Sequence, residues 1–247
     1  MINKTKKFPD LVDGKPKVSP QTFLNGEIHD WYRIILGYSD HLVSSLLDEM
    51  EIHSDQIVLD PFCGTGTTLI ECMKRGIKSV GIDANPSSYF AAKVKTSWNL
   101  DANELNRISK RVAEEYPSKL RNKATLHHDQ TYRYLETSGM IERQWISEIP
   151  LLKSLAIKSA INEVATSTIH KNALMLALLA EVVRGASNVR FGPELYCGEV
   201  KTNHNVLKGF QSRINTIILD LDKTSNLVSK KASVVYGDSR TCESIGS

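Results

Sequence analysis

Residues 56–66 read Gln56-Ile57-Val58-Leu59-Asp60-Pro61-Phe62-Cys63-Gly64-Thr65-Gly66, and this stretch decides the fold of the 247-residue chain. It is a short apolar run that ends in an acid and leads through two glycines into a helical segment, residues 67–74. A second apolar run covers residues 79–83, and Asn85-Pro86 then opens another helix. This order predicts a βαβ unit with parallel strands and a right-handed crossover.

The two glycines indicate a turn that binds a ligand, because without a Cβ the backbone can approach a bound molecule closely. Leu69 stands where a dinucleotide-binding turn has its third glycine, and no Gly-Lys-Ser/Thr follows, so a pyrophosphate site is disfavoured. A second acid, Asp83, ends the next strand, where a carboxylate can accept both hydroxyls of a ribose. The residues therefore favour a nucleoside ligand without a diphosphate, and a tight turn with no ligand is the alternative.

The rest of the chain is predicted to be mostly helical before it returns to a strand. A helix capped by Ser39 and Asp40 is expected to end near Glu51. The periodicity divides the chain into an arm (1–22), an α/β portion (23–100 plus 232–247) and a helical insertion (101–231). Within the later part we expect helices at about 103–116, 151–164, 168–185 and 205–225, a loop at 188–193 and a strand at 232–236.

Composition excludes several classes of protein. Hydrophobic residues make up 41% of the chain, which is enough for a buried core, and the apolar stretch 172–183 is too short to cross a membrane. We expect no secretory signal, because the basic N-terminus is not followed by an apolar segment. The four cysteines show no CxxC spacing, so neither a disulfide framework nor a zinc site is predicted, and a cytoplasmic location fits.

The net charge of +3 is unevenly distributed. Residues 1–17 and 101–233 are basic, whereas the remaining residues carry 7 basic and 12 acidic side chains. Such asymmetry can mark a surface for a polyanion beside a site for a different ligand. Scattered surface charge is the alternative interpretation.

At the glycine turn the sequence resembles a known family. Residues 60–68, Asp-Pro-Phe-Cys-Gly-Thr-Gly-Thr-Thr, are similar to the S-adenosylmethionine motif of DNA methyltransferases that modify the exocyclic amino group of cytosine or adenine. Three further segments, 29–39, 81–86 and 237–240, resemble the motifs that flank it, in family order. The resemblance implies an α/β fold: a partial class I, Rossmann-like methyltransferase sheet with a large helical insertion, of the restriction-modification type.

The resemblance also implies roles for individual residues, with S-adenosylmethionine as the cofactor. Asp60 and the backbone of residues 62–66 would hold its methionine end, Asp83 its ribose hydroxyls and Asp238 its adenine amino group. Individually, Tyr38 and Trp31 fit packing roles, and Cys63 is expected to be a small packing residue. The implied cofactor-binding residues are Tyr38, Ser39, Asp60, Pro61, Phe62, Cys63, Gly64, Thr65, Gly66, Thr67, Asp83, Ala84 and Asp238.

The family's catalytic motif, a polar residue followed by Pro-Pro and an aromatic, is missing from this sequence. The eight prolines lie at positions 9, 16, 20, 61, 86, 117, 150 and 193. Since no two are adjacent, we expect no catalytic residue in this chain, and by family order the motif should follow Asp238, on a missing C-terminal segment or a second polypeptide. Without that part, strand 56–60 is expected to be an exposed apolar edge.

The basic insertion is interpreted as the DNA-binding part, because cationic side chains bind the phosphate backbone. The candidate DNA contacts are Arg184, Asn188, Arg190 and Lys201, whereas the leucines of residues 174–179 read as a buried helix. His127-His128-Asp129 reads as a solvated turn, and no metal site is predicted. The sequence thus predicts the cofactor-binding part of a site-specific DNA methyltransferase; a non-catalytic cofactor-binding subunit and an RNA methyltransferase remain as alternatives.

Overall fold

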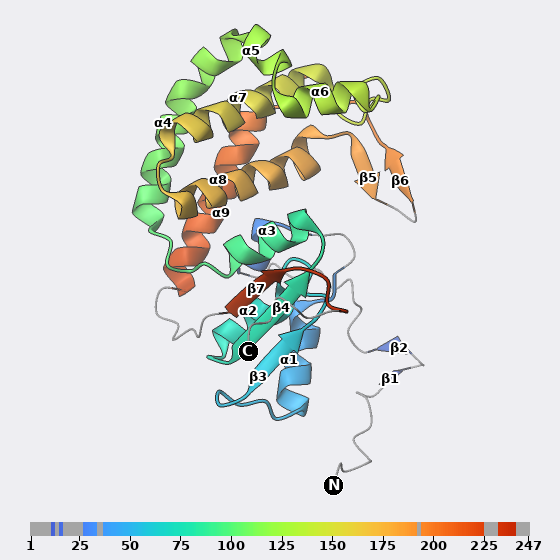
Figure 1. The fold of residues 1–247 in the computed structure, drawn as a ribbon, viewed down its shortest axis with the longest axis vertical. Coiled ribbons are helices and arrows are strands. Elements are labelled where there is room, and N and C mark those ends of the chain that lie inside the picture. Colours follow the sequence, from blue (N-terminus) through green and yellow to red (C-terminus); the bar gives the residue numbers. More distant parts are fainter. Residues whose placement is uncertain are drawn as a thin grey trace.

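A computed structural model describes residues 11–12, 15–16, 27–33, 37–191, 194–224 and 232–240. It consists of a small sheet with flanking helices and a larger helical body (Figure 1). Most of the expected arm, residues 1–22, lies outside the described residues. Its described part consists of two short antiparallel strands, β1 (Leu11–Val12) and β2 (Lys15–Pro16).

The sheet has three parallel strands in the order β3-β4-β7. They are β3 (Ile57–Asp60), β4 (Lys78–Asp83) and β7 (Ala232–Tyr236), which confirms all three predicted strands. Asp60 pairs in register with Gly81, and Asp83 with Tyr236. The strands therefore end together along one edge. In Figure 1 this edge points toward the side of the molecule from which β5 (Val189–Phe191) and β6 (Leu195–Cys197) project.

Three helices flank the sheet, as the capping residues and turns of the sequence predicted. They are α1 (Asp40–Glu49), α2 (Thr67–Lys74) and α3 (Pro86–Lys95). Ser39 caps α1, since its Oγ accepts a hydrogen bond from the backbone N–H of Leu42. The side chain of Asn85 caps α3 in the same manner. Helix α3 also packs against α8 (Thr168–Glu181), and this contact joins the sheet to the helical body.

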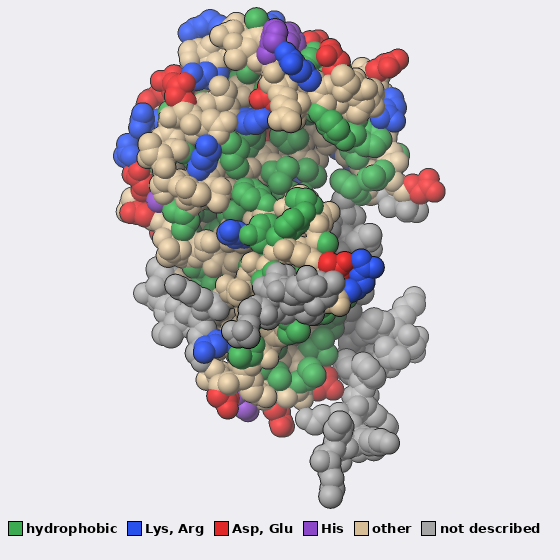
Figure 2. All heavy atoms as spheres, in the orientation of Figure 1, with side chains coloured by type: hydrophobic (Ala, Val, Ile, Leu, Met, Phe, Trp, Pro, Cys, Tyr) green, Lys and Arg blue, Asp and Glu red, His purple; other side chains and the backbone are tan. Residues whose placement is uncertain are grey.

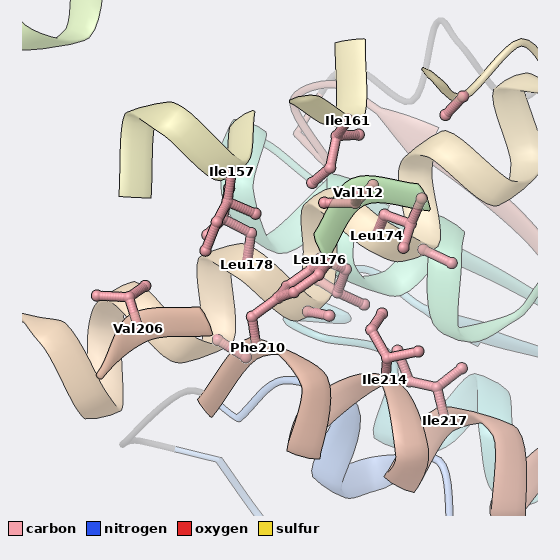
Figure 3. Close-up of a cluster of buried hydrophobic side chains, with 14 of the residues drawn as sticks. Val112, Ile157, Ile161, Leu174, Leu176, Leu178, Val206, Phe210, Ile214 and Ile217 are labelled. Atoms are coloured by element: carbon pink, nitrogen blue, oxygen red, sulfur yellow. The ribbon is translucent and has the colours of Figure 1, made fainter. Parts of the chain in front are cut away.

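The helical body is built around one apolar core. In Figure 3 the side chains of Phe210, Ile214 and Ile217 point from one helix toward Leu174 and Val112 on two others. These buried contacts are the main stabilising interactions of this part, because apolar area removed from water drives helix packing. The helices are α4 (Ala102–Arg121), α5 (Lys123–His127), α6 (Gln130–Thr137), α7 (Glu148–Val164), α8 (Thr168–Glu181) and α9 (Val206–Thr224).

Of three local predictions, one was wrong. The expected loop at 188–193 contains strand β5 (Val189–Phe191), which pairs with β6 (Leu195–Cys197) as an antiparallel hairpin. The expected helix at 168–185 is confirmed: it is formed by α8, which ends at Glu181, and by the π-helical turn η2 (Val182–Ala186) that continues it. The predicted solvated turn at 127–129 is confirmed: His128 is exposed, and the turn joins the end of α5 at His127 to α6, which Asp129 caps.

The described part of the chain contains no helix that is long and apolar enough to span a membrane.

Candidate cofactor site

Three carboxylates predicted from the sequence lie at the carboxyl edge of the sheet. Asp60 ends β3, Asp83 ends the neighbouring β4, and Asp238 follows β7 after one intervening residue, Gly237. The N–H of Gly237 donates to the carbonyl of Asp83, with an N···O distance of 3.2 Å. Clefts at the carboxyl ends of parallel strands are where α/β folds bind ligands.

The turn between β3 and α2 requires glycine. Gly64 has φ +51° and Gly66 has φ +87°, and both values fall in the left-handed region that other residues rarely adopt. A Cβ on Gly66 would also lie 3.3 Å from the Cβ of Ala92, whereas a Cβ on Gly64 would meet no atom within 4 Å. Gly64 therefore borders open space, as a turn that receives a ligand needs.

Asp60 is held by its own turn and by a tyrosine. Its Oδ1 accepts the N–H of Phe62 at 3.1 Å, and its Oδ2 accepts the hydroxyl of Tyr38 at 2.6 Å. Burial and the hydrogen bond to Asp60 both raise the pKa of Tyr38. Tyr38 is therefore a neutral donor that orients Asp60, a contact that the sequence did not predict. Ser39, the next residue, is buried as the cap of α1.

Asp83 connects β4 to the glycine turn. Its Oδ2 accepts the N–H of Gly64 at 2.9 Å and its Oδ1 accepts the N–H of Asn85 at 2.8 Å. Each carboxylate oxygen can accept two hydrogen bonds, so each retains the capacity for one more donor. Ala84 lies exposed directly beyond this carboxylate.

Asp238 is paired with a neighbouring cation. The Nε of Arg240 lies 3.0 Å from both carboxylate oxygens of Asp238, and the backbone N–H of Arg240 donates to Oδ1 at 2.9 Å. These hydrogen bonds lower the pKa of Asp238 to about 2. The side chain is therefore an ionised acceptor at neutral pH.

The remaining residues of the turn divide into buried and exposed positions. Cys63 is buried against Leu69 and Ala92, which confirms its predicted packing role, and burial raises the pKa of its thiol to about 12. Phe62 is 74% exposed and projects from the turn. Pro61 precedes Phe62, Thr67 begins α2, and Thr65 lies between the two glycines.

The segment before the glycine turn is fixed to the helical body. Trp31, in the one-turn helix η1 (His29–Trp31), is buried, which confirms its predicted packing role. Its Nε1 donates to Oδ2 of Asp220 on α9 at 3.0 Å, and the N–H of Ile28 donates to the same oxygen at 2.8 Å. Asp220 was not singled out in the sequence, because its partners lie about 190 positions away.

His29 of η1, Asp40 of α1 and Glu71 of α2 form a cluster of possible metal ligands. The Nζ of Lys74, however, lies 2.8 Å from Glu71 Oε1 and 3.4 Å from His29 Nε2. The ammonium group therefore already supplies positive charge to this cluster, and burial lowers the pKa of His29.

Of the four candidate DNA contacts, Asn188 is fully buried. Its Nδ2 donates to the carbonyl of Gln144 at 2.8 Å and its Oδ1 accepts the N–H of Lys201 at 2.8 Å. The side chain is thus occupied in anchoring the hairpin, so this position does not present a side chain to DNA in the structure.

The three basic candidates lie around the base of the hairpin but differ in their surroundings. The Nζ of Lys201 donates to the carbonyl of Ser187 at 2.9 Å, and Arg190 donates to the carbonyl of Val189 at 3.0 Å. Arg184 is exposed on η2, where partial desolvation and the neighbouring Arg213 lower its pKa. The hairpin itself exposes apolar side chains, and Figure 2 shows hydrophobic surface on it above a hollow in the molecule. These side chains are Phe191, Leu195 and Tyr196.

The parallel sheet, its glycine turn and the acids at its carboxyl edge define a partial Rossmann-like methyltransferase fold. Residues 33–94 match the sequence model of a family described as DNA methylase, and this range includes the glycine turn. The chain is therefore related to the DNA amino-methyltransferases of restriction-modification systems.

Individual relatives agree with the family match. The type II methyltransferase M.BsoBI of Geobacillus stearothermophilus is 38% identical over 126 residues, which are 48% of this chain and 24% of the relative. M.MvaI of Kocuria varians is 29% identical over 133 residues, or 53% of this chain and 28% of the relative. M.MjaII of Methanocaldococcus jannaschii is 32% identical over 103 residues, which are 37% of this chain and 19% of the relative. The matches span about a quarter of these relatives, and no solved structure matches the chain significantly.

Proposed function

We propose that this chain is the S-adenosylmethionine-binding part of a site-specific DNA methyltransferase that acts on the exocyclic amino group of cytosine or adenine. The observation that carries the proposal is the convergence of Asp60, Asp83 and the glycine turn at one sheet edge, within a segment that matches DNA methylases. When bound, the cofactor supplies an electrophilic methyl group for an amino nitrogen of the base.

The residues at this edge fit the groups of that cofactor. Asp83 retains one acceptor position on each oxygen, which suits the two hydroxyls of a ribose. Asp60 offers a carboxylate to the cofactor's ammonium, and Asp238 an ionised acceptor to the adenine amino group. The open space at Gly64 leaves room for the methionine end.

Titration calorimetry with S-adenosylmethionine tests the cofactor site. We expect Asp83→Ala to weaken binding by about 10- to 100-fold, since hydrogen bonds to a charged group contribute roughly 1.5–3 kcal/mol. Asp55→Ala, which removes an exposed carboxylate from the turn before β3, is the matched control and should bind normally. Full affinity in Asp83→Ala would contradict the ribose assignment, and an unaltered chain that binds no cofactor would contradict the proposed function itself.

We also propose that the catalytic motif is supplied by a further segment or a second polypeptide that pairs with β3. Within the described residues β3 pairs on one side only, with β4. Ile57 and Leu59 are 66% and 52% exposed, so this edge presents both unpaired backbone groups and apolar side chains. The greater length of the relatives supports the idea that the matched region works together with additional chain.

DNA is the proposed substrate, and the hairpin β5–β6 the proposed contact. The hairpin combines basic residues at its base with exposed aromatic and apolar side chains, and a two-stranded ribbon fits the major groove of DNA. Asn188 takes the role of anchoring this hairpin.

A non-catalytic cofactor-binding subunit is the second candidate, because no two prolines of the sequence are adjacent. Transfer of labelled methyl groups to DNA by this chain alone would contradict both candidates, since each places the catalytic motif elsewhere.

A further inference from the structure

Lys95, the last residue of α3, is a lysine buried beside the candidate cofactor site. Its side chain is 1% exposed, although lysine is among the residues least often buried. The ammonium donates to the carbonyl of Tyr32 at 3.3 Å and to the hydroxyl of Thr65 at 3.5 Å. Tyr32 follows η1, and Thr65 lies between Gly64 and Gly66. One side chain thus connects the glycine turn to the segment that follows η1.

Within the described part of the chain, no acid forms an ion pair that would balance the charge of Lys95. Among the residues placed in the structure, Lys95 forms no salt bridge, and the nearby acids have other partners: Asp30 pairs with Arg33, and Glu71 pairs with Lys74 and with His29. Burial, followed by the positive charges of Arg33, Lys74 and Arg184, lowers the pKa of Lys95 to about 7, and Asp30 opposes this shift. The charged groups that act on Lys95 are Asp30 and Arg33 near η1, Lys74 on α2 and Arg184 on η2, and Lys95 in turn acts on His29.

We propose that Lys95 is a positioning residue that holds the glycine turn against the segment after η1, so that its protonation state sets the affinity of the site for S-adenosylmethionine. The inference rests on the proposed function. A protonated ammonium donates strongly to both oxygen acceptors, whereas a neutral amine donates weakly. The site is therefore held in its binding geometry at low pH and loosens as the proton is lost, so cofactor affinity falls as pH rises through neutrality.

Calorimetry with S-adenosylmethionine between pH 6 and pH 8.5 tests this inference on the full chain. Lys95→Met keeps the length and removes the charge; we expect it to bind about tenfold more weakly than the unaltered chain at pH 6, with a flat pH profile. Thr65→Val, which removes one acceptor, should weaken binding in the same direction and serves if Lys95→Met does not fold. Lys93→Met is the matched control, because Lys93 is an exposed lysine on the same helix, and it should retain the original profile.

Urea unfolding without cofactor provides a readout that is independent of the proposed function. The pKa of Lys95 in the folded chain lies below its unfolded value of about 10.4. At a pH between these two values, Lys95 is protonated in the unfolded chain and neutral in the folded chain. This group alone then raises the folding equilibrium constant up to about tenfold per pH unit in that window, and Lys95→Met abolishes the rise. If the unaltered chain binds the cofactor and Lys95→Met keeps its affinity and pH profile, the inference about Lys95 is overturned. If the unaltered chain binds no cofactor, the proposed function fails instead.

Discussion

A single carboxylate oxygen on α9 ties the segment before the glycine turn to the helical body. Oδ2 of Asp220 accepts hydrogen bonds from the N–H of Ile28 and from the indole of Trp31, and all three residues are buried. A buried donor that loses its partner costs about 1–3 kcal/mol, because it has already given up its hydrogen bond to water. This one residue therefore has two donors to satisfy.

We predict that Asp220→Ala lowers the free energy of unfolding by about 3 kcal/mol, as judged by urea denaturation, because it leaves both donors unsatisfied. Asp220→Asn keeps an acceptor oxygen and should lose less than half as much. Asp55→Ala again serves as the exposed control and should be within about 0.5 kcal/mol of the unaltered chain. Equal losses in Asp220→Ala and Asp55→Ala would show that the contact is not stabilising.

At the scale of elements, the sheet and its helices could be predicted because their signals are local. An apolar run, an acid, two glycines and a cap lie next to one another, and each acts on neighbouring backbone. The hairpin β5–β6 could not be predicted in this way, because Asn188, which anchors it, is hydrogen-bonded to the backbone carbonyl of Gln144, 44 positions away. The π-helical turn after Glu181 was not predicted for a similar reason. The buried Glu181 carboxylate lies 2.6 Å from Nε2 of His204, which is 23 positions away, just before α9.

The same distinction applies to the candidate site. Asp60 and Asp83 could be predicted because each ends a strand, and parallel strands end at the same edge. The hydrogen bond from Tyr38 to Asp60 and the bridge made by Lys95 depend on how separate segments meet in space. Lys95 did leave a signal, because it lies four positions after Ala91 on the inward face of α3, where an apolar residue is expected.

The exposed edge of β3 leads to a prediction about self-association. An unpaired apolar edge is a template for strand pairing, and charged side chains on such an edge suppress it. We expect the double substitution Ile57→Lys with Leu59→Lys to lower the apparent molecular mass of concentrated samples toward that of a monomer, as measured by light scattering after size-exclusion chromatography.

The control for this edge is Leu219→Lys, since Leu219 is 60% exposed on α9 and lies on no strand. It should leave self-association unchanged. If all these variants change association equally, exposed apolar area in general is responsible, and the edge of β3 has no special role.

At the scale of the whole molecule, the acidic sheet edge and the basic insertion occupy different parts of one structure. The hairpin carries its apolar side chains above a hollow, and the carboxyl ends of the strands point toward the same side (Figures 1 and 2). A cationic cofactor at the sheet edge and a polyanion at the hairpin would then meet at this side of the molecule, which is the geometry that methyl transfer to a base requires.

The salt dependence of DNA binding distinguishes the two kinds of contact that the hairpin offers. Each phosphate neutralised by a basic group adds roughly −0.9 to the slope of log K against log salt, whereas stacking or apolar contact adds none. In fluorescence anisotropy with a labelled duplex, Arg190→Ala should therefore make the slope shallower by about 1. Tyr196→Ala should weaken binding about tenfold at every salt concentration and leave the slope unchanged. Lys110→Ala, which removes an exposed lysine from α4, is the basic control. A slope change equal to that of Arg190→Ala would mean that the effect of charge does not depend on its position and that the hairpin is not the phosphate contact.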